Sequence, residues 1–224
     1  MTLASSELQK ISSYVTTLRL TAPELASKKE IVSRAYRRFH GLLLFGLLIE
    51  KRPAAHREFA RECLSDCSSS FFFTLTAFYK PGLLCLRSAI ENYLRFLVSL
   101  DGTDPGTIPT VYELFAEAKS RYPTGSIERP FIDRLHTQYA LLCRTSHTTK
   151  IDHMSLEVPF SRLNVHSTTK AEENLRRIDL VCTQMLNMWF SVFHQNLNEI
   201  GPDNADLTRS LVPRSLKRAI SNKE

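Results

Sequence analysis

Apolar residues recur at steps of three and four along most of the chain, which is the period of an amphipathic helix. The clearest case lies between residues 171 and 197, where the charged residues Glu173, Arg176 and Arg177 fall off the apolar face. The apolar positions of this segment are Leu175, Ile178, Leu180, Val181, Met185, Leu186, Trp189, Val192 and Phe193. The pattern predicts a long helix over about 168–200, which Gly201 and Pro202 end.

Helix-breaking residues divide the rest of the chain. The expected loops lie at 101–109 and 149–167, and the other expected helices cover residues 5–20, 23–51, 54–79, 82–100, 110–121 and 126–147. Thr21 is the expected cap of the second helix, with Glu24 in its first turn. The stretch SSSFFFTLTAF is ambiguous, because Phe and Thr also favour strands. The predicted fold class is all-α: an antiparallel bundle of four to five long helices with extra short helices.

The same breakers suggest a division of the chain into three parts. These are an N-terminal helix (1–22), the helical bundle (23–201) and a basic C-terminal tail or arm (202–224). From residue 209 onward, five basic residues face Glu224 alone. Within the bundle, the run GLLLFGLLI at 41–49 is apolar on nearly all sides, so it predicts a buried central helix or a subunit interface.

Composition narrows the class of protein. Of the 224 residues, 43% are hydrophobic and only 7 are glycine, which suits a sizeable helical core. The 5 cysteines are scattered without a CxxC, which argues against a disulfide framework and for a reducing cytosol. The start shows no signal pattern, and a nine-residue apolar run cannot span a bilayer. We therefore expect a cytoplasmic protein with no membrane partner. The net charge of +6 is compatible with an anionic partner.

Candidate chemistry centres on the stretch YALLCRTSH, residues 139–147. On a helical projection Tyr139 lies in the core stripe, while His136, Cys143 and His147 form a neighbouring row. Arg144 stands on the flank of that row, three residues from His147, so the two side chains can act on one ligand.

A second candidate pair lies in the helix predicted over 82–100. Arg87 and Glu91 are four residues apart on one face, which is the spacing of an intrahelical ion pair. If that face is buried, the two charges require a further partner, and Arg144 or His147 from the other helix would be suitable.

These residues carry a resemblance to a known family. LLCLRSAIENYLRFL, followed about forty residues later by YALLCRTSH and then by a long final helix, resembles the HEPN superfamily over roughly residues 30–200. Arg87 and Glu91 match its Arg-x-x-x-Glu helix. The later Tyr-x-x-Leu-(Ser/Cys)-x-x-x-His motif is matched by Tyr139, Leu142, Cys143 and His147.

The resemblance implies a four- or five-helix bundle, frequently dimeric, from a toxin–antitoxin or anti-phage defence system. Active members are metal-independent RNases that need no cofactor, so Arg144 and His147 become the expected catalytic residues. Arg87, Glu91, Tyr139 and Cys143 become the residues expected to bind the substrate or to position the catalytic pair, and RNA, another nucleic acid or a protein of the defence system becomes the expected partner. Arg144 and His147 are two residues apart in place of the family's four to six.

Other interpretations of the same residues stay open. The bundle could be a non-catalytic subunit that binds a partner protein, with Arg87, Glu91 and His147 as a structural polar cluster. A zinc site could use His136, Cys143 and His147 with a fourth ligand such as His153, and Cys63 and Cys67 form another pair at helical spacing. Cys143 could also be a nucleophile with His147 as its base.

Overall fold

The computed structural model describes residues 29–146 and 166–222, and within these ranges it is helical and contains no strand. The elements are α2 (Lys29–Ile49), α3 (Ala54–Leu75), α4 (Tyr79–Ser99), the 3-10 turn η2 (Pro105–Thr107), α5 (Val111–Arg121), α6 (Arg129–Ser146), α7 (Thr168–Phe193), the 3-10 segment η5 (His194–Ile200), α8 (Pro202–Leu211) and α9 (Arg214–Ser221). The all-α prediction is confirmed, and the ambiguous Phe-rich stretch is helical up to Leu75.

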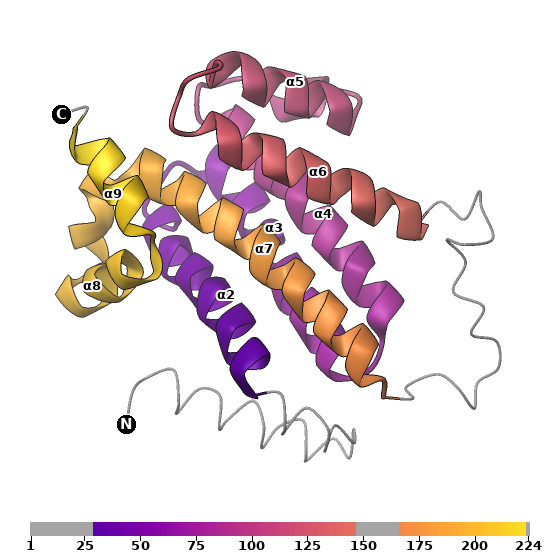
Figure 1. Cartoon of the computed structure of the whole chain (residues 1–224). Coiled ribbons are helices and arrows are strands. Elements are labelled where there is room, and N and C mark those ends of the chain that lie inside the picture. Colours follow the sequence, from indigo (N-terminus) through magenta and orange to yellow (C-terminus); the bar gives the residue numbers. More distant parts are fainter. Residues whose placement is uncertain (1–28, 147–165, 223–224) are drawn as a thin grey trace.

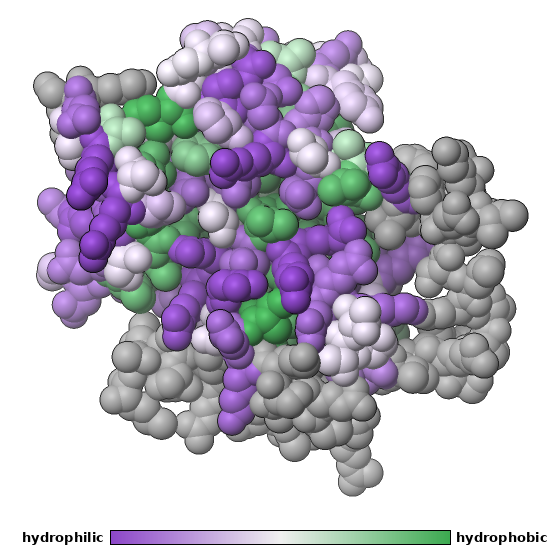
Figure 2. All heavy atoms as spheres, viewed as in Figure 1, coloured by the Kyte–Doolittle hydropathy of each residue, from purple (hydrophilic) through white to green (hydrophobic). Residues whose placement is uncertain are grey.

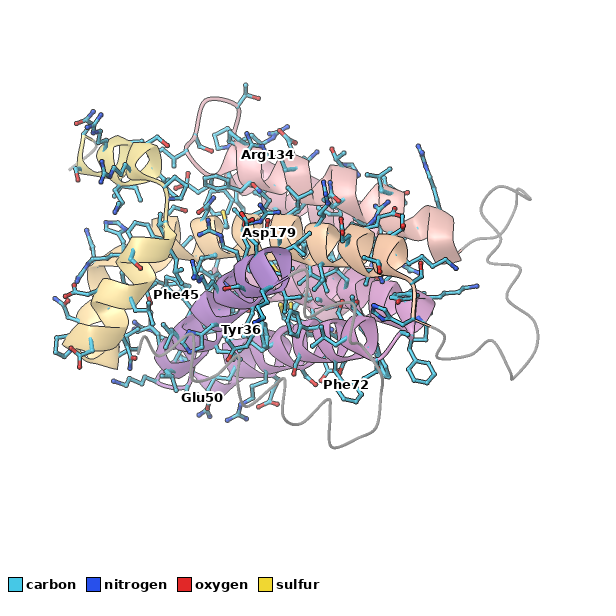
Figure 3. The ribbon with its side chains drawn as sticks, turned by 60° about the horizontal axis from the view of Figure 1, so that its bottom comes forward. Tyr36, Phe45, Glu50, Phe72, Arg134 and Asp179 are labelled. Carbon is cyan, nitrogen blue, oxygen red and sulfur yellow. The ribbon has the colours of Figure 1, made fainter. Side chains whose placement is uncertain are left out.

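The long helices form a bundle in which α3 and α4 make an antiparallel hairpin, and α7 packs against α2, α4 and α6 (Figure 1). Trp189 of α7 is fully buried at the centre. Its ring lies 5.8 Å from Phe45 of α2 and 5.5 Å from both Tyr93 and Phe96 of α4. One side chain thus joins three helices that are distant in sequence. At the surface, Asp179 of α7 pairs with Arg34 of α2 at 2.9 Å, and Figure 3 shows Asp179 beside α2.

The break between α3 and α4 falls earlier than the Lys80-Pro81-Gly82 stretch that the sequence suggested. The turn between the two helices contains Ala77, which adopts a left-handed φ of 63°. For a residue with a Cβ this backbone conformation costs about 1 kcal/mol or more. Pro81 then lies in the first turn of α4, where its missing N–H is not needed. A Cβ at Gly82 would come within 3.0 Å of the Thr74 hydroxyl, so this glycine permits the close approach of the two helices.

Capping explains the ends of α5 and α7. Thr110 and Glu113 form a reciprocal capping box at the start of α5, and the Ser167 side chain accepts a hydrogen bond from a backbone N–H at the start of α7. The helix predicted over 168–200 is continuous to Phe193 and then tightens into η5, and Gly201 ends it with a φ of 88°.

The segment expected to be a basic tail or arm is helical and packs on the bundle. Ala205 and Thr208 of α8, and Leu216 and Ile220 of α9, are buried, whereas Arg214 and Arg218 of α9 are exposed. Arg38 of α2 also donates to the carbonyl of Leu211. The apolar positions of the segment draw it onto α2 and α7 because their burial is favourable. None of the described helices is long and apolar enough to cross a membrane.

Some expectations fall outside the described residues. They are the N-terminal helix at 5–20, the cap at Thr21 and most of the loop at 149–167.

Candidate functional site

A polar cluster joins α4 to α6. The hydroxyl of Tyr139 in α6 donates to Glu91 Oε1 in α4 at 3.0 Å, and Arg87 Nη2 lies 3.1 Å from the same oxygen. Arg87 Nε also donates to the Tyr139 hydroxyl at 3.4 Å, and its guanidinium carbon lies 5.5 Å from the centre of the Tyr139 ring. Burial raises the pKa of the Tyr139 hydroxyl above its usual range, so it remains a donor.

A second arginine extends the cluster along α4. Arg95 Nη1 lies 3.9 Å from Glu91 Oε2, so one carboxylate faces two guanidinium groups at positions i−4 and i+4. The side chains of Arg87, Glu91 and Arg95 are 26%, 20% and 27% exposed, whereas Tyr139 is 3% exposed. The cluster therefore carries one net positive charge that solvent and ligands can reach.

Helix α5 supplies an aromatic wall beside this cluster. Phe115 is buried, and its ring stacks on His136 of α6 with centroids 4.4 Å apart. The rings of Phe115 and Tyr139 are 5.7 Å apart, and Tyr112 makes edge contacts with His136 at 5.9 Å and with Tyr139 at 6.4 Å. Tyr112 itself remains 61% exposed. The wall thus runs from the buried Phe115 to a tyrosine in solvent.

His136 lies against a second set of charges. Lys119 Nζ is 3.1 Å from His136 Nδ1, which makes Nδ1 the acceptor and leaves the ring proton on Nε2. Burial, with the charge of Lys119, lowers the pKa of His136, so the ring is neutral at pH 7. Lys119 and Arg129 share the carboxylate of Asp133 at 2.9 and 3.0 Å, which repeats the two-to-one arrangement around Glu91.

The structure brings together Arg87, Glu91 and Tyr139 but separates the rest of the expected set. Cys143 is partly buried and packs against the core, and Arg144 is exposed with no ion pair to any described residue. Of the two further partners expected for Arg87 and Glu91, Arg144 makes no ion pair with either residue, and His147 lies outside the described residues; Tyr139 is the α6 side chain that contacts both.

Sequence reasoning missed Arg95, Tyr112 and Lys119. Arg95 has a local signal, since it is four residues after Glu91. Tyr112 and Lys119 have none, because only the packing of the short helix α5 on α6 brings them to this face.

Of the cysteines in the alternative interpretations, the pair Cys63 and Cys67 lies in the core. Cys63, Cys67 and Cys182 are buried together between α3 and α7, and hydrogen bonding to Cys67 together with burial raises the pKa of Cys63 and Cys182. These two thiols are therefore protonated core groups. In the described part of the chain no group of three or more histidine, cysteine or acidic side chains is arranged to hold a metal. The proposed ligands His147 and His153 lie outside that part.

The face of the molecule shown in Figure 2 is mainly hydrophilic, with apolar patches between polar side chains. Arg134 of α6 is exposed, and Figure 3 labels it on that helix. Searches against family models, curated proteins and solved structures find no match to this chain. Guanidinium and ammonium donors beside an exposed aromatic ring suit a ligand that has both phosphates and bases.

Proposed function

We propose that this chain is a HEPN-like protein of a prokaryotic defence or toxin–antitoxin system that binds RNA on the face formed by α4, α5 and α6. The observation that carries the proposal is the unequal pairing around Glu91, where Arg87 and Arg95 share one carboxylate. This leaves donors for an anion beside an exposed aromatic ring. RNA offers phosphates at regular intervals, and Arg binds them through its planar fork of N–H donors.

Long-range electrostatics supports the same ligand. The net charge of +6 favours encounter with a polyanion, and counterion release makes such binding weaken as salt rises. The Arg87 side chain is held in place by Tyr139 and Glu91, so little side-chain entropy is lost when a phosphate binds.

The test is RNA binding by arginine variants. Fluorescence anisotropy with a labelled single-stranded RNA should show weaker binding by the Arg87→Gln/Arg95→Gln protein, and a salt slope reduced by about 2, since each lost phosphate contact removes about 1. Arg176→Gln is the control, because it removes an exposed arginine that pairs with Glu172 within α7, a helix outside the α4–α6 face. If the double variant binds like the control across the salt range, RNA does not use this face.

Catalysis is the second part of the proposal. His147 would act as general acid and base for attack by the RNA 2′-hydroxyl, while Arg144, exposed and unpaired among the described residues, would stabilise the phosphorane charge. His147→Ala should abolish RNA cleavage in the presence of a chelator and leave RNA binding and the melting temperature unchanged. Wild-type protein that leaves RNA intact, alone and with its partner, would refute catalysis but not binding.

A non-catalytic role has its own supporting observation. Tyr139 is almost fully buried and hydrogen-bonds both Arg87 and Glu91, which fixes α6 against α4 as a structural cluster would. In that case the chain would act as an interaction subunit, as a homodimer or with a protein of the defence system. Analytical ultracentrifugation measures the oligomer, and Tyr139→Phe would then lower the melting temperature in a protein that binds no RNA.

A further inference from the structure

We propose that Tyr112 is a stacking platform for one unpaired RNA base. The proposal rests on the proposed RNA-binding function and deepens it, because it selects single-stranded RNA as the ligand and adds a contact that phosphate binding does not require. Among the large apolar side chains that stay exposed in the described residues, Tyr112 is the only aromatic one, and it is 61% exposed.

The Tyr112 ring is held in a fixed orientation. Its plane stands at 72° to the His136 ring and at 88° to the Tyr139 ring. Both contacts are of the edge type, so neither neighbouring ring stacks parallel to Tyr112. Tyr112 also lies in the first turn of α5, which the Thr110–Glu113 capping box fixes. An aromatic side chain that is mostly exposed and already in contact with two fixed rings favours stacking, because little entropy is lost on binding.

Cations lie next to both rings that hold Tyr112. The Arg87 guanidinium lies 5.5 Å from the centre of the Tyr139 ring, and Lys119 Nζ lies 3.1 Å from Nδ1 of His136. A base stacked on Tyr112 would therefore lie near two basic side chains that could bind its flanking phosphates. This combination of an aromatic face and flanking cations is typical of sites that bind single strands without reading sequence.

Base pairing distinguishes the ligand. In an RNA duplex the faces of each base are covered by the neighbouring bases. The Tyr112 ring could therefore stack on a base of a duplex only if the bases were first unstacked. Stacking on Tyr112 therefore predicts a preference for single-stranded over double-stranded RNA of the same length, with little dependence on sequence.

The test uses the full chain and a single-stranded RNA that carries 2-aminopurine at one position. Wild type and Tyr112→Phe should bind it equally and quench its fluorescence, because both have an aromatic face. Tyr112→Leu keeps an apolar side chain but has no aromatic ring, and it should bind about tenfold more weakly without quenching. Since Tyr112 is mostly exposed, all three proteins should melt at the same temperature.

The outcomes separate the two proposals. If Tyr112→Leu binds and quenches like wild type while Arg87→Gln/Arg95→Gln loses binding, the stacking site is refuted and the RNA-binding function stands. Failure of the wild type to bind any RNA overturns both proposals. Equal loss of duplex and single-strand binding in Tyr112→Leu would also contradict stacking on an unpaired base.

Discussion

Glu91→Gln tests the pairing of Glu91 with Arg87, Arg95 and Tyr139, because we expect it to lower the stability of the protein and to raise its affinity for RNA. In the wild type the carboxylate accepts a hydrogen bond from Tyr139 at 3.0 Å and faces Arg87 at 3.1 Å and Arg95 at 3.9 Å. Glutamine keeps the shape of the side chain and removes its charge. The variant should therefore be less stable than the wild type yet bind RNA more tightly.

The size of the stability change follows from the contacts. A hydrogen bond to a charged group contributes about 1.5–3 kcal/mol when buried, and exposed ion pairs contribute about 0.2–1 kcal/mol. Because Glu91 is one-fifth exposed and glutamine retains an acceptor, we expect a loss of about 1–2 kcal/mol. For a chain of this size that corresponds to a melting temperature lower by about 2–8 °C.

The size of the affinity change follows from Coulomb's law. For a phosphate assumed to lie about 7 Å from the Glu91 carboxylate, beyond the Arg87 guanidinium, the repulsion in a water-like dielectric is about 0.6 kcal/mol. Its removal should strengthen RNA binding about threefold.

Circular dichroism melts and fluorescence anisotropy measure the two effects on one preparation. Glu173→Gln is the matched control, since it removes the same charge from an ion pair with Arg177 in a side chain that is 60% exposed. It should change stability by only a few tenths of a kcal/mol. A Glu91→Gln protein that melts like wild type would refute the structural argument, and one that binds RNA more weakly would refute the placement of RNA on this face.

Three further predictions concern stability. Burial, and then the charge of Lys119, lowers the pKa of His136, so protonation of this ring opposes folding. The free energy of unfolding should therefore fall as the pH drops below 6.5, the ordinary pKa of histidine. In melts recorded over a range of pH, His136→Gln should lack this part of the pH dependence. Trp189→Ala should lose about 3–5 kcal/mol in urea unfolding followed by circular dichroism, whereas Trp189→Phe, which leaves a smaller cavity, should lose less. Ala77→Gly should gain about 0.5–1 kcal/mol in the same assay, because glycine adopts the left-handed φ without strain; an unchanged or lower midpoint would contradict this.

The sequence by itself determined the helices, and it did so through short-range chemistry. The spacing of apolar residues in 171–197 predicts α7, and Gly201 marks where η5 ends, since helix period and termination depend on residues a few positions apart. It also singled out Arg87, Glu91 and Tyr139, by their spacing and by resemblance to a family. Whether Arg144 and His147 are catalytic stays a prediction.

Only the tertiary structure decided which of these residues meet. The α3–α4 turn is centred on Ala77 because the close packing of α4 on α3 at Gly82 outweighs the local preference of alanine. The basic C-terminal segment folds back as α8 and α9 because α2 and α7 offer an apolar surface to bury against. The partner of Glu91 from another helix is Tyr139, 48 residues away, and the exposed Tyr112 reaches the same site from a third helix. Such contacts depend on how helices pack, and the period of a single helix contains no information about its neighbours.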